Sequence, residues 1–430
     1  STSRRQRQMC IRDRYECFYL KSNIEKTEKM RKICFVTCGA LPVPAIKGGA
    51  IEQLIELLIN ENERTPKFEF TVVECCDSKV EQEFKKYKYT HFVQLKHPKS
   101  RENKLWWKLR GGVRKLTGND ISIILPFNRR VRNFLCNKGA DFDYIISEGC
   151  EIGVFSKPSK MYGTDKFVNH IHCETFSTPF LEDTFGHIIV VGDFIKKQFM
   201  SSMTKKDMSI SVLKNRIDLS KFAKNIHLKE KTEIRRNLGF SLDDFVIIYC
   251  GRIIEVKGVK ELIEAVLSID NPKIKVMIVG SSDFKGAQMT DYQSSVCNMA
   301  VQHKDRVVFT GYIDNMNLYR YHKSADIAVV PSICEEAFNI AILEFLASGI
   351  PTIATRSGGL VEEGTSATTL FIDKEHDLVN SIRKAIMELY NNPSKLSVMS
   401  KNSVERSRLF DKNMYLNEFE NVINQLGQNE

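Results

Sequence analysis

The chain has 430 residues, 42% of them hydrophobic and 27% charged, and its formal net charge is +10. This length exceeds one ordinary hydrophobic core, so we expect a globular protein of two domains, and the positive charge favours an anionic partner. No apolar run approaches the roughly 18 residues of a membrane-spanning helix, and the charged amino-terminal stretch differs from a secretory signal, so we expect a cytoplasmic protein.

Residues 1–29 are basic and polar without sustained periodicity, and we interpret them as a disordered or foreign extension. From Ile33 onward, short apolar runs alternate with amphipathic helices, which is typical of βαβ units in a parallel sheet covered on both faces. The alternation occurs twice. It predicts two Rossmann-like, doubly wound α/β domains that face each other across a cleft, residues 30–218 and 219–410.

The predicted strands are residues 33–38, 70–74, 92–95, 144–147, 167–172 and 188–191 in the first domain, and 246–250, 275–279, 307–310, 327–331 and 352–354 in the second. The last segment, residues 411–430, reads as a helix with Tyr415, Phe419, Val422 and Ile423 on one face. We expect this helix to pack back on the first domain.

Each domain offers a candidate anion site after its first strand, where ligands of open α/β sheets collect. In the first domain, Gly48 and Gly49 precede a helix, so a phosphate could approach backbone amides there, although a simple loop explains the pair equally well. In the second domain, Arg252 ends a strand and Lys257 precedes a helix. A guanidinium and an ammonium together suit a diphosphate, but solvated loop cations are the alternative.

Two histidines, His170 and His172, lie two residues apart and hence on one sheet face if the strand is regular. Such a pair could bind a metal, but the sequence offers no obvious carboxylate partner, and we expect no metal site. A hydrogen-bonding role near the cleft is therefore the interpretation for His172, and a core position for His170. The twelve cysteines form no CxxC pair and are expected to be reduced thiols.

Two carboxylates, Glu336 and Glu344, flank seven residues between a predicted strand and the turn at Gly349. A buried carboxylate is costly unless a partner pairs with it, so the two together indicate a polyhydroxylated ligand such as a sugar or a ribose. Solvated helix charges are the alternative. Downstream, Gly358 and Gly359 form a turn that could close round a ligand or only reverse the chain.

In this order the motifs resemble those of the family 4 retaining glycosyltransferases, which have the two-domain GT-B fold. The resemblance covers nearly all of the chain from Met30. It rests on Gly48-Gly49, His172, Asn215-Arg-Ile-Asp218, Gly251-Arg252 with Lys257, Gly280, Gly311, Pro331-Ser332, Glu336 and Glu344, and Gly358-Gly359 with Glu362.

The resemblance implies transfer of a sugar from a nucleotide-diphosphate sugar to an acceptor hydroxyl with retention of anomeric configuration. Arg252 and Lys257 would neutralise the diphosphate in place of a metal, and no cofactor would be needed. Glu344 would bind the ribose. Glu336 and the backbone amides of Phe338, Asn339 and Ile340 would bind the donor sugar. Gly48 and Gly49 would admit the phosphates, and His172 would meet the donor sugar.

The chain departs from the family pattern at three positions. Ala337 and Asn339 stand where Pro and Gly are common, which leaves the donor-sugar preference open, although Asn can still cap the helix that follows. Arg216 replaces the usual Gly before the linker and could alter the hinge. None of the three removes a residue with an implied role.

Residues 104–116 combine both tryptophans of the chain with five cations. A segment of this composition could bind to an anionic membrane surface at the inner face of the cell membrane. The acceptor would then be a lipid-linked saccharide, as in cell-surface polysaccharide or glycolipid synthesis. A mobile acceptor loop or a packed surface segment are the alternatives. Basic residues with interleaved aromatics are concentrated near Trp106, and no nucleic-acid module is recognisable, so no nucleic-acid partner is expected.

Two other functions share the same resemblance: a nucleotide-sugar epimerase and a non-catalytic sugar-nucleotide-binding protein. An epimerase needs acid and base groups around the sugar ring, whereas Glu336, Arg252 and Lys257 suit binding better than proton abstraction. A binding protein could have lost one of Arg252, Lys257, Glu336 or Glu344, and all four are present. The sequence therefore favours the transferase.

Overall fold

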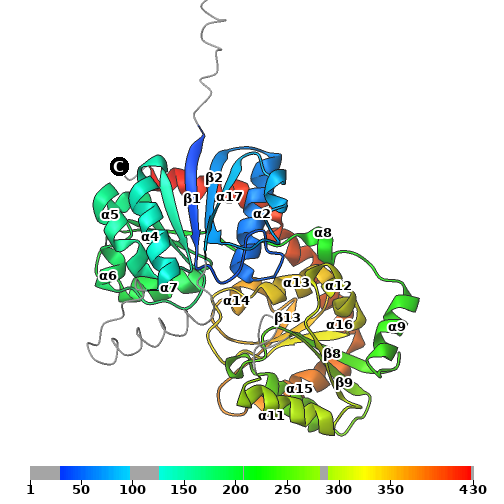
Figure 1. Ribbon diagram of the computed structural model, residues 1–430. Helices are drawn as coiled ribbons and strands as arrows, with labels where there is room; N and C mark the ends of the chain where they lie inside the picture. Colours follow the sequence, from blue (N-terminus) through cyan, green and yellow to red (C-terminus); the bar gives the residue numbers. More distant parts are fainter. Residues whose placement is uncertain (1–29, 97–124, 207, 281–288, 428–430) are drawn as a thin grey trace, which may run out of the picture.

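The computed structural model describes residues 30–96, 125–206, 208–280 and 289–427. Within these ranges the chain forms two parallel sheets in two separate lobes (Figure 1). The first sheet has seven strands in the order β3-β2-β1-β4-β5-β6-β7, and the second has six in the order β10-β9-β8-β11-β12-β13. The prediction of two doubly wound α/β domains is confirmed.

The strands of the first sheet are β1 (Arg31–Thr37), β2 (Phe68–Cys75), β3 (Thr90–Leu95), β4 (Tyr144–Glu148), β5 (Phe167–Ile171), β6 (His187–Val190) and β7 (Ser209–Val212). Those of the second are β8 (Phe245–Cys250), β9 (Ile274–Val279), β10 (Val307–Gly311), β11 (Ile327–Val330), β12 (Thr352–Thr355) and β13 (Thr369–Ile372). The sequence prediction missed β7 and β13, which are four residues long and lie at sheet edges.

The helices of the first lobe are α2 (Ala50–Arg64), α4 (Pro126–Lys138), α5 (Ser156–Tyr162), α6 (Pro179–Glu182) and α7 (Asp193–Ser202). The second lobe has α8 (Leu219–Phe222), α9 (Leu228–Asn237), α10 (Val259–Leu267), α11 (Asp291–Gln302), α12 (Asn315–Ser324), α13 (Ile340–Ser348), α14 (Leu360–Glu363), α15 (Leu378–Tyr390) and α16 (Pro393–Ser407). None of the described helices is long and apolar enough to cross a membrane.

The last helix, α17 (Tyr415–Leu426), leaves the second lobe and packs on the first sheet beside α2 (Figure 1). The ring of Phe419 lies 5.5 Å from that of Phe68, 5.8 Å from that of Phe35 and 6.0 Å from that of Phe70. Aromatic packing of this kind adds to the burial of apolar surface. The end of the chain thus contributes to the core of its beginning.

The chain crosses between the lobes twice, and the two crossings lie side by side. Ile217 forms a parallel bridge with Asp411, and Lys412 Nζ lies 2.8 Å from a carboxylate oxygen of Asp218. Arg216 is buried here and donates to both carboxylate oxygens of Glu418 on α17. The side chain that replaces the glycine of the family pattern therefore ties the outgoing crossing to the returning helix.

The strand order of each sheet reverses between two adjacent strands, β1 and β4 in the first sheet and β8 and β11 in the second. Ligands of open α/β sheets bind beyond the carboxyl ends of the strands at such reversals. The Gly48-Gly49 loop follows β1, Arg252 follows β8, and Glu336 follows β11. The topology therefore brings the residues predicted from the sequence to the edges of the sheets where a ligand would bind.

Candidate active site

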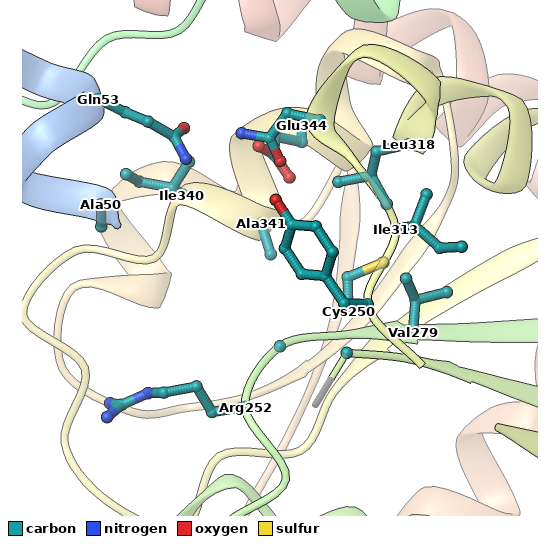
Figure 2. Close-up of a pocket in the computed structure, with 14 residues that line it drawn as sticks. Ala50, Gln53, Cys250, Arg252, Val279, Ile313, Leu318, Ile340, Ala341 and Glu344 are labelled. Atoms are coloured by element: carbon teal, nitrogen blue, oxygen red, sulfur yellow. The ribbon is translucent and has the colours of Figure 1, made fainter. Parts of the chain in front are cut away.

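A cavity of about 270 Å³ opens between the two lobes (Figure 2). Its wall in the first lobe comes from Ala50 and Gln53 of α2, which Figure 2 shows across the opening from Glu344. The remaining lining residues belong to the second lobe: Cys250, Gly251, Arg252, Val279, Gly280, Tyr312, Ile313, Asn315, Leu318, Ile340, Ala341 and Glu344. The cavity is thus polar at Arg252 and Glu344 and largely apolar between β9 and α12.

Glu344 lies on α13, a helix that the Asn339 side chain caps by accepting from the Ile342 amide, and that Gly349 ends in a left-handed conformation. Its side chain is only 8% exposed, and burial raises the pKa of the carboxyl to about 8 against a weak opposing effect of Lys221. None of the described residues donates a hydrogen bond to this carboxylate. Once ionised, this carboxyl is a hydrogen-bond acceptor at the cavity wall whose capacity no described residue uses.

Two backbone segments approach each other closely where the cavity meets β8 and β9. A Cβ atom on Gly280 would lie 2.0 Å from the carbonyl oxygen of Gly251, and the φ of Gly280 is +142°. A side chain could not fit between these segments, so the glycine leaves backbone exposed beside Arg252. The guanidinium of Arg252 extends from this loop into the opening between the lobes (Figure 2).

Lys257 and Glu336 form an ion pair, with Lys257 Nζ 2.6 Å from Glu336 Oε1. Glu336 is 7% exposed and also accepts from the hydroxyl of Ser332. The Gly358-Gly359 turn lies directly on the backbone of Glu336, because a Cβ on Gly358 would be 2.2 Å from the Glu336 carbonyl oxygen. The sequence located these residues separately, and the structure joins them into one unit.

The loop from Phe338 to Ile340 is supported by a residue that the sequence analysis missed. Glu363 on α14 accepts a hydrogen bond of 2.6 Å from the Asn339 amide, and its burial raises the pKa of the carboxyl well above its ordinary value. One of the three backbone amides implied to bind the donor sugar is therefore occupied in this structure. Phe338 is buried against the ring of Phe410, 6.1 Å away.

The expectation that the histidine pair lacks a carboxylate partner was wrong. Glu148, the last residue of β4, lies 2.6 Å from His172 Nε2 and 3.1 Å from His170 Nδ1. The predicted strand ended one residue earlier, at Ser147, so the carboxylate at the sheet edge was not considered. These three side chains also place one possible metal-ligand atom each within 4.8 Å of one another.

At the start of α2, Gly48 and Gly49 have φ values of +79° and +102°. A Cβ on Gly49 would lie 2.1 Å from a carboxylate oxygen of Glu52, so the amino end of α2 is already approached by a carboxylate of its own first turn. Burial raises the pKa of Glu52. The positive amino end of the helix and the two glycines agree with an anion site. An anion bound there would lie beside the Glu52 carboxylate unless that side chain moved away.

A second carboxylate that the sequence analysis left without a role connects the two lobes. Glu362 of α14 accepts hydrogen bonds from the amides of Asp193, at 2.9 Å, and Phe194 at the start of α7. An acidic group at a helix amino terminus is favourable because the first amides have no partner within the helix. Glu362 thus holds the lobes together on the side of the cleft formed by α7.

Residues 230–406 match the family model described as "Glycosyl transferases group 1". An uncharacterized glycosyltransferase of Methanocaldococcus jannaschii is 34% identical over 177 residues, 41% of this chain and 43% of that protein. A lipopolysaccharide 1,2-N-acetylglucosaminetransferase of Salmonella typhimurium is 25% identical over 272 residues, 61% of this chain and 69% of that protein. The chain thus spans less than half the length of the first of these relatives.

The structure of Anabaena HepE in complex with UDP-glucose superposes with a TM-score of 0.69 at 16% sequence identity, covering 92% of this chain and 99% of the other. At this identity the likeness concerns the fold alone. It shows that the two lobes have the two-domain GT-B fold.

Proposed function

We propose that this chain, whose residues 230–406 form a group 1 glycosyltransferase domain, transfers a sugar from a nucleotide-diphosphate sugar to an acceptor hydroxyl with retention of anomeric configuration. The observation that carries the proposal is the cavity between the lobes, where the free carboxylate of Glu344 and the cation of Arg252 share one wall. It is a family 4 enzyme in this proposal, as its motifs imply.

The nucleoside half of the donor fits the part of the cavity around Glu344. Two ribose hydroxyls supply the donors that this carboxylate lacks, and binding them offsets the cost of burying its charge. The apolar side chains of Val279, Ile313 and Leu318 offer a surface for the base. The UDP-glucose complex of HepE, which has the same fold, supports a nucleotide sugar as the class of ligand.

The diphosphate fits the opening beside Arg252, where Gly251 and Gly280 leave the backbone uncovered. Lys257 lies on the same loop and reaches the ligand from its ion pair with Glu336. Together the two cations stabilise the negative charge that develops on the leaving phosphate. This arrangement needs neither a metal nor a cofactor in the step itself.

Glu336 and His172 lie beyond the diphosphate on opposite lobes and bind the donor sugar in this proposal. The acceptor hydroxyl enters on the face that the nucleotide leaves, through an oxocarbenium-like state, and the departing phosphate takes its proton. Closure of the lobes brings the Gly48-Gly49 loop onto the phosphates and excludes water. The stereochemistry follows the resemblance to the retaining family.

The proposed acceptor is a saccharide or a lipid-linked saccharide of cell-surface polysaccharide or glycolipid synthesis. The Salmonella relative, named for lipopolysaccharide, supports this class. Residues 104–116, whose composition would allow docking on an anionic surface at the inner face of the cell membrane, lie outside the described residues. The membrane contact is therefore proposed on composition alone.

The test is incubation of the protein with UDP-, GDP-, ADP- and dTDP-sugars and saccharide acceptors, with release of nucleoside diphosphate and the product's anomeric proton coupling as readouts. We expect one donor class to give a product of unchanged anomeric configuration. An altered nucleotide sugar without nucleotide release would identify an epimerase instead. Tight binding with neither outcome would identify a binding protein.

A further inference from the structure

Glu148 and the two histidines form a buried hydrogen-bonded unit at the carboxyl edge of the first sheet. Glu148 is 3% exposed and pairs in register with His170 on the neighbouring strand β5. Each of its carboxylate oxygens meets one imidazole: Oε1 lies 3.1 Å from His170 Nδ1, and Oε2 lies 2.6 Å from His172 Nε2. Each oxygen of the carboxylate thus faces one imidazole nitrogen.

The charge state of this unit follows from its surroundings. Burial alone would raise the pKa of Glu148, but His170 and His172 hold it low, at about 2, so the carboxylate is ionised. Burial and the neighbouring His170 lower the pKa of His172 although Glu148 opposes them, which favours a neutral ring. An ionised carboxylate accepts hydrogen bonds and cannot donate.

These contacts decide which nitrogen of His172 carries the proton. Nε2 faces an acceptor-only oxygen at 2.6 Å, so Nε2 must be the protonated nitrogen. In a neutral ring Nδ1 then has a lone pair and can accept a hydrogen bond. The His172 side chain is 10% exposed, so part of it remains accessible.

We propose that Glu148 is a positioning residue that fixes His172 in the Nε2–H tautomer, so that His172 presents Nδ1 as a hydrogen-bond acceptor to a hydroxyl of the donor sugar. The inference rests on the proposed function, which places His172 against that sugar. Among the described residues, the carboxylate of Glu148 forms its hydrogen bonds with these two histidines. Carboxylates in other sites orient an imidazole in the same way, by accepting a hydrogen bond from the ring nitrogen that does not face the ligand.

A metal ion held by the same three side chains is the rival interpretation. Two features favour the hydrogen-bonded unit. Both Glu148–histidine distances are hydrogen-bond lengths, which leaves a proton rather than a cation between each pair of atoms. The neighbouring space is also narrow and lined by apolar side chains, among them Leu54, Leu58 and Phe419, so little room remains for a metal-bound water.

The direct test is the tautomer of His172, read from long-range ¹H–¹⁵N spectra of the full chain labelled only at histidine, with His172→Gln used to assign the signal. We expect a neutral ring with protonated Nε2 and bare Nδ1. An Nδ1–H ring or a doubly protonated ring at pH 7.5 would overturn the proposal, and neither reading depends on enzyme activity or on a Glu148 variant.

The kinetic test compares Glu148→Gln with Glu148→Asp, which keeps the acceptor charge, and with Glu81→Gln at an exposed position. We expect Glu148→Gln to lower kcat about tenfold or more, with KM for the donor within threefold and the affinity for that donor's nucleoside diphosphate unchanged. We expect Glu148→Asp to retain more activity. A kcat within twofold of the parent would overturn the proposal. The proposal would also be overturned if the purified parent contained one equivalent of zinc and the Glu148→Gln variant contained none.

The two proposals fail separately. An inactive parent with the predicted His172 tautomer would refute the proposed function and leave the side-chain geometry intact. An active parent with the other tautomer would refute only the role given to Glu148.

Discussion

Replacing Glu344 by glutamine is expected to stabilise the ligand-free protein at neutral pH. Burial raises the pKa of this carboxyl from an ordinary 4.5 to about 8, so the folded chain keeps a proton that the unfolded chain has lost. When folding raises the pKa of a group, the group's contribution to the free energy of unfolding is fully present below the pKa of the unfolded chain. That contribution is lost as the pH rises through the pKa of the folded protein. Glutamine has the same shape and no charge to bury.

The size of the effect follows from the pKa values. Between pH 4.5 and pH 7 the parent loses about 1.4 kcal/mol of unfolding free energy per pH unit at this site, so the variant should gain about 3 kcal/mol at pH 7 relative to pH 4.5. Above pH 8 the difference should level off, because the carboxyl is then ionised in both states. The same substitution should weaken nucleotide binding, since the amide replaces an ionised acceptor for the ribose.

The assay is urea unfolding of the parent and of Glu344→Gln from pH 5 to pH 8.5, with Glu81→Gln, at an exposed position, as the matched control. The stability difference should grow with pH for Glu344→Gln and stay flat for the control. A difference that does not depend on pH, or that favours the parent at pH 8, would refute the burial argument.

Two further predictions concern the diphosphate and the contact between lobes. Changing Arg252 and Lys257 together to alanine should weaken binding of the nucleoside diphosphate of the identified donor at least tenfold in calorimetry. The affinity for the corresponding nucleoside should change less than threefold, because only the diphosphate carries the charge that they neutralise. Equal losses would count against this assignment. Glu362→Gln removes the anion at the start of α7 and should weaken the contact between the lobes by about 1 kcal/mol. X-ray scattering of the ligand-free variant should therefore give a larger radius of gyration than that of the parent. An unchanged radius would show that other contacts hold the lobes together.

The sequence predicted the two sheets because their central strands are buried on both faces and read as continuous apolar runs, as in β1 and β8. It failed at the edges. In β7, Ser209 and Ser211 alternate with apolar residues over only four positions, and β13 is equally short, so neither segment exceeds the signal of a loop. Pairing with a neighbouring strand, which supplies the missing stability, is not visible in the local sequence.

In the candidate site, too, the sequence revealed individual residues but not the contacts between them. Strand ends could be located from the sequence, and with them Arg252 and Glu336, and Glu344 was found by its spacing from Glu336. The partners could not, because they are brought together only by the fold: Lys257 and Glu336 are 79 positions apart, and Glu148 and His172 are 24 apart. Glu363 and Glu362 follow a glycine turn that gave no indication of which backbone amides they would face.

The most direct test of the account is a crystal structure of the protein with a non-hydrolysable nucleotide-diphosphate sugar. The account predicts the ribose hydroxyls on the carboxylate of Glu344, the diphosphate within hydrogen-bond distance of Arg252 and Lys257, and the sugar between Glu336 and His172. A ligand bound outside the cavity between the lobes, or one whose diphosphate contacts neither cation, would contradict it.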